Sequence, residues 1–295
     1  MKRGWITWDK AEISPEVFEQ RVNRVRRVLA ERGLPALVVY SELWRSNQAR
    51  FFSNFMPYFN RALLIIPRDL PVILLCGLSP RVYGWIRSVT TIEDVRPAGN
   101  FAKPLFEIAR EREWTQIGAL EVEQIPYDLY QVLHSGSLGV VNVEAPAVFA
   151  PAEDETERAM RRKTIALVTT ILEEEIPKGV GLVDHHLVGW LERRFRRAGA
   201  EDLIVLLTNG RTVPAPPNGT TLEENFSVSV ALEYRGHWVR VSRPHGFAKR
   251  PERDVDCSER LDGSYPYEYG TGTITAQHIE FEHNGKRLFY GDTIL

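Results

Sequence analysis

The chain has 295 residues, of which 43% are hydrophobic and 26% charged, and its formal net charge is -2. This length allows about two domains with buried cores, and the near-neutral charge gives no electrostatic reason to expect nucleic acid or a membrane surface as a partner. The sequence has no apolar run of signal-peptide or membrane-spanning length and only two cysteines, so we expect a cytoplasmic protein without a disulfide framework.

The first 150 residues alternate between helical and strand patterns. Residues 15–33 carry an apolar stripe at helical spacing and end at a glycine. The apolar run 36–40 predicts a buried strand, and 61–67 with 71–76 predicts a pair of strands. Further elements are expected at 79–89, 103–114, 116–121, 125–136 and 139–145. This alternation predicts an α/β domain over residues 1–150.

An Ala- and Pro-rich break over 145–155 precedes a region with a different pattern. Two helices are expected there, at 154–176 and 184–199. Strands are expected at 203–210, in a hairpin over 227–243, and in a last pair around the turn Asn284-Gly285. The polar segment 244–272 is expected to be a long loop. Two helices against a curved antiparallel sheet predict an α+β domain over residues 151–295.

Polar side chains are dense within the strand patterns of this second region: Glu233, His237, Arg240, Arg243, His278, Glu280 and Asp292. Strand alternation places Arg240 and Arg243 on opposite faces of a sheet. A half-solvated sheet face would show much the same pattern, so the pattern alone leaves a functional role open. Sequence motifs for a zinc peptidase helix, a phosphate-binding loop or a nucleophilic serine elbow do not occur.

These elements, in this order, resemble the creatinase/aminopeptidase P family, whose members share the pita-bread fold. NQARFFSNF at 47–55 is similar to the family's N-x-x-Y-hydrophobic-[ST]-G-F. The hairpin ending at Arg243 resembles hydrophobic-D-x-G-x-x-Y-x-G-Y-x-x-D-x-[ST]-R, and the terminal GDTIL resembles G-[DE]-T-hydrophobic-L. The resemblance implies a creatinase-like α/β N-terminal domain over 1–150, then a truncated α+β pita-bread domain over 151–295.

The sequence departs from the family at the metal ligands, which are two Asp, one His and two Glu around two metal ions. By the resemblance, Ser229 and Arg240 stand at the Asp positions, and the histidine expected near 212–217 is absent. Gln277 and Asp292 are expected in place of the two Glu. A guanidinium would repel a divalent cation. We therefore expect a protein without a metal ion or other cofactor.

Creatinase, a metal-free relative, lends a Phe-x-Arg from its N-terminal domain to clamp the substrate carboxylate in the neighbouring subunit. Phe59-Asn60-Arg61 stands in the same place, just before a strand. The resemblance implies that Phe59 and Arg61 bind substrate and that the chain forms a homodimer. An ordinary surface arginine is the alternative. The histidine base of creatinase falls at the missing position, so its mechanism does not transfer.

Two functions stay open at this point. The first is a metal-independent hydrolase or lyase acting on a small amino-acid-like carboxylate by C–N cleavage, elimination or cyclisation. There Arg240 replaces the metal, and His237 or His278 with Glu233 moves protons. The second is a catalytically inactive pseudopeptidase that binds a ligand or a homologous partner, favoured by the lost metal ligands and the short segment 244–272. The sequence does not identify the substrate.

Overall fold

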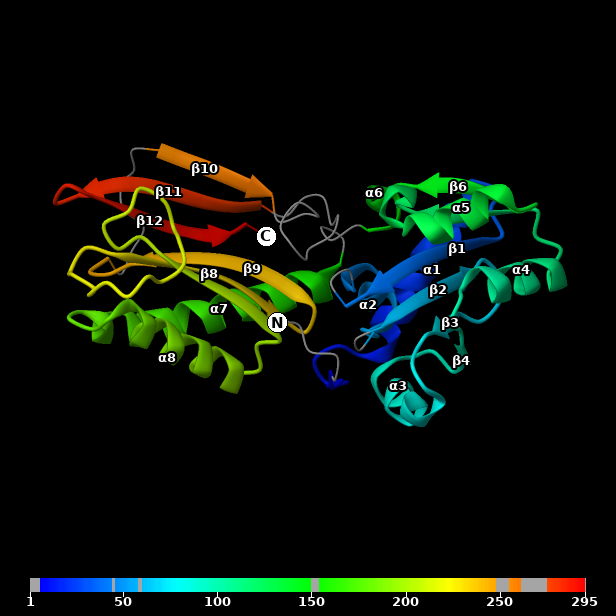
Figure 1. The fold of residues 1–295 in the computed structure, drawn as a ribbon, viewed down its shortest axis with the longest axis horizontal. Coiled ribbons are helices and arrows are strands. Elements are labelled where there is room, and N and C mark those ends of the chain that lie inside the picture. The colour runs from blue at the N-terminus through cyan, green and yellow to red at the C-terminus, as the bar shows by residue number, and fades with distance from the viewer. Residues whose placement is uncertain are drawn as a thin grey trace. The chain divides into compact units, whose positions relative to one another are not determined.

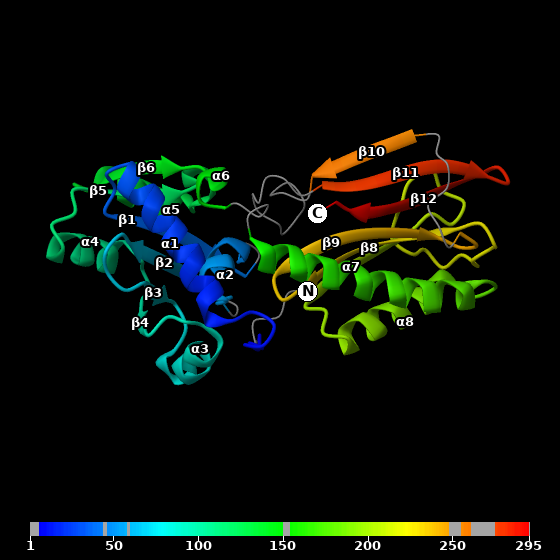
Figure 2. The same cartoon turned by 180° about the vertical axis from the view of Figure 1, so that it is seen from behind.

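The computed structural model describes residues 6–43, 46–57, 60–149, 154–247, 255–260 and 275–294. These residues form two compact units, one ending at residue 149 and the other beginning at residue 154. Figures 1 and 2 show the fold of each unit from two opposite sides. Phe59, one of the predicted substrate-binding residues, lies outside the described residues.

The first unit is built on a six-stranded sheet with the order β4-β3-β2-β1-β5-β6. Its strands are β1 (Ala36–Glu42), β2 (Arg61–Pro67), β3 (Ile73–Cys76), β4 (Asp94–Pro97), β5 (Gln116–Leu120) and β6 (Gly139–Val143). Its helices are α1 (Pro15–Glu31), α2 (Asn47–Ser53), α3 (Tyr83–Val89), α4 (Ala102–Glu111), α5 (Tyr127–Ser135) and α6 (Ala145–Val148).

Both faces of this sheet are covered, which explains why its central strands are apolar throughout. Leu37 and Val39 of β1 pack in a cluster with the apolar stripe of α1, including Val25. Val38 and Leu63 point the other way and pack against α4 and α5. Figures 1 and 2 show α1 on one side of the sheet and α4 and α5 on the other. The unit is therefore a three-layer α/β/α domain.

The second unit is built on a sheet with the order β10-β11-β12-β9-β8-β7. Its helices are α7 (Glu155–Glu175) and α8 (Asp184–Arg197). Its strands are β7 (Asp202–Leu207), β8 (Ser227–Tyr234), β9 (His237–Pro244), β10 (Val255–Arg260), β11 (Thr275–His283) and β12 (Lys286–Thr293). All neighbouring strands run antiparallel.

One face of this sheet carries the hydrophobic core. Val230 and Val239 pack with Val168 of α7 and Leu191 of α8 in one buried cluster. We call this the helix face. Within the described residues no helix packs on the opposite face, which we call the open face (Figures 1 and 2). Because side chains alternate along a strand, every second residue of a strand points to the same face of the sheet.

Most elements agree with those expected from the sequence, but several form where none was expected, including α6 at the start of the Ala- and Pro-rich break. Segment 244–272 is not one continuous loop, because β10 forms within it and pairs with β11. Strand β4 and the short helix α2 also form without having been expected. None of the helices in the described part of the chain is long and apolar enough to cross a membrane.

Candidate functional site

Strand pairing brings three of the four predicted catalytic residues to the open face. Ser229 of β8 is opposite Ser242 of β9, which places Glu233 and Arg240 on the face shared by these two serines. Ser242 is opposite Gly291 of β12. His278 of β11 is in turn opposite Gly291. Glu233, Arg240 and His278 therefore share one face.

A hydrogen-bonded row crosses four strands on this face. The Oγ atoms of Ser229 and Ser242 are 2.6 Å apart, and Ser242 Oγ is 3.0 Å from Nδ1 of His278. Gly291 lies between Ser242 and His278 in the strand order. A Cβ atom on Gly291 would stand 2.6 Å from His278 Nδ1, closer than two non-bonded atoms approach. The missing side chain of Gly291 therefore lets the imidazole reach across a strand.

The imidazole of His278 is neutral at physiological pH. The residue is only 6% exposed. Burial, and then the positive charges of Arg240 and Arg243, lower the pKa of His278 to about 3. A histidine with this pKa neither carries a positive charge nor accepts a proton near pH 7.

Arg240 is the cationic group of the open face next to Ser242. Its side chain is half-buried, and its cross-strand neighbour is the small residue Ala231. The hydroxyl of Thr293 accepts from the backbone N–H of Arg240 at 2.8 Å and donates to its carbonyl oxygen at 3.1 Å. Glu233, two residues along β8 from Ala231, is fully buried. The part of the open face around Ser242 therefore carries the guanidinium of Arg240, the carboxylate of Glu233 and a row of neutral hydrogen-bonding groups.

His237 is not part of this group, contrary to the sequence-based expectation. It lies on the helix face, where its Nε2 is 2.9 Å from Glu157 Oε2 of α7. Arg161 pairs with the same carboxylate and donates to the carbonyl oxygen of Trp238 at 2.6 Å. The side chains of His237, Glu157 and Arg161 are all buried. The His237 group thus anchors α7 to the β8–β9 hairpin.

Gln277 and Asp292 also occupy the helix face. They were expected at the family's metal-ligand positions, but the residues of β11 and β12 that share a face with Ser229 are their sequence neighbours, so the expectation is wrong by one residue. They pair with each other across β11 and β12, next to the pair His278–Gly291. Arg243, on the helix face too, donates to Asp292 Oδ1 at 2.8 Å and to Thr169 Oγ1 of α7 at 3.1 Å. The residues that share the open face with Ser229 and Arg240 are His278 and Gly291.

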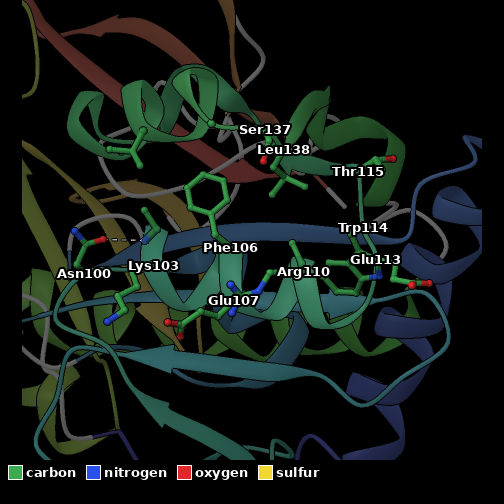
Figure 3. Close-up of a pocket in the computed structure, with 14 residues that line it drawn as sticks. Asn100, Lys103, Phe106, Glu107, Arg110, Glu113, Trp114, Thr115, Ser137 and Leu138 are labelled. Carbon is green, nitrogen blue, oxygen red and sulfur yellow. Dashed lines mark hydrogen bonds between the residues drawn. The ribbon is translucent and has the colours of Figure 1, made fainter.

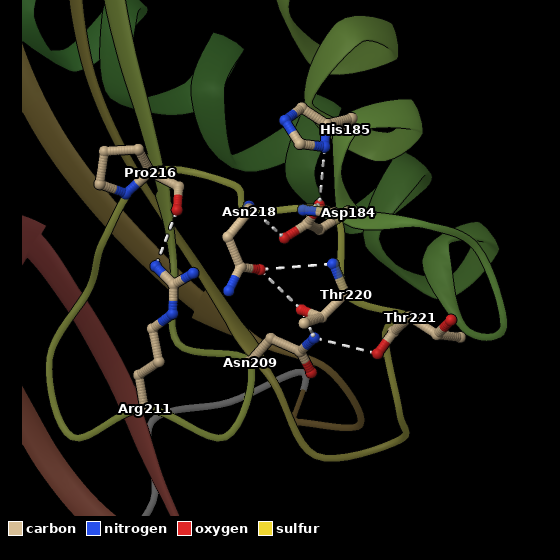
Figure 4. Close-up of polar contacts among 9 residues, drawn as sticks. Asp184, His185, Asn209, Arg211, Pro216, Asn218, Thr220 and Thr221 are labelled. Carbon is tan, nitrogen blue, oxygen red and sulfur yellow. Dashed lines mark hydrogen bonds and ion pairs between the residues drawn. The ribbon is translucent and has the colours of Figure 1, made fainter.

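The segment near 212–217, where the family's histidine was expected, belongs to a loop held to the start of α8 (Figure 4). The buried Asp184 carboxylate accepts from the backbone N–H groups of Asn218 at 2.8 Å and Gly219 at 2.9 Å. Burial raises the pKa of Asp184, but these hydrogen bonds outweigh it and the pKa lies below its usual value. Arg211 donates to the carbonyl oxygen of Pro216 at 2.7 Å. The loop is fixed by these contacts.

In the first unit, Arg61 lines a cavity of about 150 Å³ together with Tyr40 and Phe101. Its guanidinium is 45% exposed and lies 3.6 Å from Asp128. Burial, followed by the nearby charge of Glu42, raises the pKa of Tyr40 to about 12, so this phenol stays neutral. Because the Arg61–Asp128 pair is largely solvated, it is weak, and the guanidinium is accessible to an anion.

A second cavity of about 920 Å³ lies between α4 and the end of α5 (Figure 3). Phe106 points from α4 toward Gly136, where an added Cβ would approach its ring to 2.5 Å. Lys103, Glu107 and Arg110 follow one another at helical spacing on the exposed side of α4. Alternating charges of this kind are typical of a solvated helix, so this cavity has no assigned role.

The open-face residues do not fit a metal ion. In the part of the chain that the structure describes, no three His, Cys, Asp or Glu side chains are grouped to hold one. The open face instead presents a hydroxyl (Ser229), a guanidinium (Arg240), a glycine (Gly291) and an imidazole whose Nδ1 faces Ser242. A fixed positive charge opposes binding of a divalent cation.

Solved structures of similar fold include Xaa-Pro peptidases. The X-Pro aminopeptidase of Thermotoga maritima matches with a TM-score of 0.71 and 14% identity, covering 92% of this chain and 93% of that one. The Xaa-Pro dipeptidase of Bacillus anthracis matches with a TM-score of 0.66 and 12% identity, covering 94% of each chain. The X-prolyl aminopeptidase of Caenorhabditis elegans, described as a cytosolic enzyme with a di-nuclear active site, matches at 0.64 and 9% identity over 99% of this chain and 61% of that one.

These matches confirm the predicted pita-bread fold. No protein-family model and no curated protein sequence matches the chain. At 9–14% identity the likeness establishes the fold, and the activities of those peptidases do not transfer with it.

The depressed pKa of His278 predicts a stability loss at mildly acidic pH. The unfolded chain takes up a proton at the ordinary histidine pKa of about 6.5, whereas the folded protein does so only near pH 3. Stability therefore falls as pH drops below about 6.5, by about 2–3 kcal/mol at pH 4.5. The melting temperature of the His278→Gln variant should fall less between pH 7 and pH 4.5 than that of the wild type. The exposed His283→Gln is the control; equal losses in all three proteins would contradict the prediction.

We also predict that the purified protein carries no stoichiometric divalent metal ion. The open face carries the guanidinium of Arg240, whose fixed positive charge opposes binding of a divalent cation. Elemental analysis should find far less than one Mn, Zn, Co or Fe ion per chain, and a chelator should leave the melting temperature unchanged. One or more tightly held ions per chain would show that other residues supply ligands.

Proposed function

We propose that the second domain binds a small carboxylate on its open face through Arg240, without a metal ion. The observation that supports this is the position of the guanidinium. It is half-buried, on the face not covered by helices, and beside the neutral row of Ser229, Ser242 and His278. A planar guanidinium pairs with both oxygens of a carboxylate, which gives direction as well as charge.

The surroundings of Arg240 favour a fixed binding group over a mobile surface arginine. Thr293 holds both its backbone N–H and its carbonyl oxygen. Its cross-strand neighbour is the small, buried residue Ala231. A pre-positioned partner loses less conformational entropy when it binds, so it contributes more to affinity.

A second function, metal-independent hydrolysis or elimination, has one observation in its favour. Ser242 Oγ is 3.0 Å from His278 Nδ1, the distance expected of a nucleophile and its base. A general base works best when its pKa is near the working pH. The pKa of His278 is about 3, far below that range, and Ser242 is fully buried. The geometry therefore favours binding over catalysis.

Two arginines on one strand provide a matched test of the binding proposal. Arg240→Ala should weaken binding of a small carboxylate such as lactate by about one to two decades, the loss of a charged hydrogen bond worth roughly 1.5–3 kcal/mol. Its melting temperature should change little. Arg243→Ala should instead destabilise the fold by about 3–5 kcal/mol, because it leaves a buried network incomplete.

Isothermal titration calorimetry and thermal unfolding separate the two effects. An Arg240→Ala protein that binds carboxylates as the wild type does would remove the basis of the proposal. A panel of amides and peptides incubated with the protein tests the second function. Turnover that is lost in Ser242→Ala would establish catalysis in place of simple binding.

We further propose that the chain is a homodimer in which Arg61 reaches the open face of the partner subunit. The basis is the Phe59-Asn60-Arg61 match and the exposed guanidinium of Arg61 at the start of β2. A carboxylate ligand held by arginines from two subunits would be bound more tightly than by either one. This proposal concerns the assembly, and its binding test uses the carboxylate affinity proposed for Arg240.

Light scattering should give a dimer mass, and Arg61→Ala should weaken lactate binding several-fold without dissociating the dimer. Arg68, next to the far end of the same strand and also exposed, is the matched control. Arg68→Ala should bind as the wild type does. A monomer in solution, or equal affinities for the Arg61 and Arg68 variants, would contradict the proposal.

A further inference from the structure

A buried nitrogen on the open face has no hydrogen-bond partner among the described residues. It is Nε2 of His278, in a side chain that is more than nine-tenths buried. The other ring nitrogen, Nδ1, faces Ser242. A buried polar atom left without a partner costs free energy. The same atom gains from any ligand that can supply the missing partner.

The hydroxyl row decides whether Nε2 is a donor or an acceptor. If Ser229 donates to Ser242 and Ser242 donates to His278 Nδ1, both hydroxyl hydrogens are used. A neutral ring whose Nδ1 accepts carries its hydrogen on Nε2. In the opposite polarity, His278 Nδ1 donates to Ser242 and Ser242 donates to Ser229. The hydrogen of Ser229 then has no acceptor among the hydrogen bonds of the described residues.

The first polarity leaves one unpaired atom, and the second leaves two. The first arrangement is therefore lower in free energy, because it avoids one unsatisfied hydroxyl group. Gly291 keeps the ring in this position, since a Cβ atom there would collide with Nδ1. The ring thus lies between Ser242 and Gly291, with a hydrogen on Nε2.

We propose that His278 donates a hydrogen bond from Nε2 to the carboxylate that Arg240 pairs with. This inference rests on the proposed function and specifies its ligand. Around His278 the open face brings together the positive charge of Arg240, the neutral donor of His278 and the buried carboxylate of Glu233, while Arg287 further along β12 is paired with Glu280. A second negative charge on a ligand would be repelled by the Glu233 carboxylate. The site therefore selects monocarboxylates over dicarboxylates and phosphate.

The first experiment examines the imidazole of the ligand-free protein by ¹⁵N nuclear magnetic resonance, with the His278 signals assigned by comparison with His278→Gln. We expect the hydrogen on Nε2 and no protonation between pH 8 and pH 5. Arg240 and Arg243, the charged groups that act on the ring, keep their charge over this range. A hydrogen on Nδ1, or titration near pH 6–7, would overturn the inference.

The second experiment titrates the protein with lactate, malonate and inorganic phosphate. Lactate should bind the wild type in preference to the other two and should shift the Nε2 signal of His278. His278→Ala should weaken lactate binding about tenfold, while His278→Gln, which keeps an N–H donor, should retain most of it. The exposed His283→Gln is the control and should bind as the wild type does.

The outcomes separate this inference from the proposed function. Lactate binding that depends on Arg240 but is unchanged in His278→Ala overturns the inference and leaves the proposed function standing. Preference for malonate or phosphate overturns the monocarboxylate assignment alone. Absence of binding by any monocarboxylate, in protein whose thermal unfolding shows it folded, overturns both.

Discussion

The second domain depends on how its sheet is joined between β9 and β12. Among the described residues, β9 and β12 share one backbone-paired position, Ser242 opposite Gly291. Side chains supply the remaining links. Arg243 donates to the carbonyl oxygen of Gly291 at 2.9 Å and to Asp292 at 2.8 Å, and its guanidinium lies 4.5 Å from the centre of the Tyr290 ring. The join is therefore made by polar side chains on both faces.

The same links shape the open face. Thr293 reaches from β12 to both backbone groups of Arg240, so the residue that carries the positive charge is fixed by the join itself. Ser242 reaches in the other direction, to His278 on β11, across Gly291. Removing either contact would loosen the sheet and displace a site residue together. Stability and the proposed binding site thus share the same atoms, which is why Arg243, on the helix face, provides the comparison for Arg240.

The sequence allowed most of the fold to be predicted because its apolar periodicity and turn residues are clear. Alternation correctly separated Arg240 from Arg243. Alternation did not show whether Gln277 or His278 lies on the same face as Ser229, because a one-residue shift in register moves every side chain of a strand to the other face. Only the pairing of β11 with β12 and of β12 with β9 decides that His278 faces Ser242. His237 was misplaced for a related reason, since its partner Glu157 is 80 residues away on α7. The polar composition of 244–272 likewise concealed β10, whose pairing with β11 is long-range.

A row of hydroxyls ending at a neutral imidazole has a different chemistry from a cluster of acids. Acids concentrate negative charge, which must be balanced by cations, whereas Ser229, Ser242 and His278 satisfy one another without any net charge. The positive field of Arg240 and Arg243 then keeps the imidazole neutral. A neutral imidazole in turn adds no repulsion to the guanidinium of Arg240, which can share the face with it at little cost. These groups are compatible with one another on one face, as the proposed binding of one small anion requires.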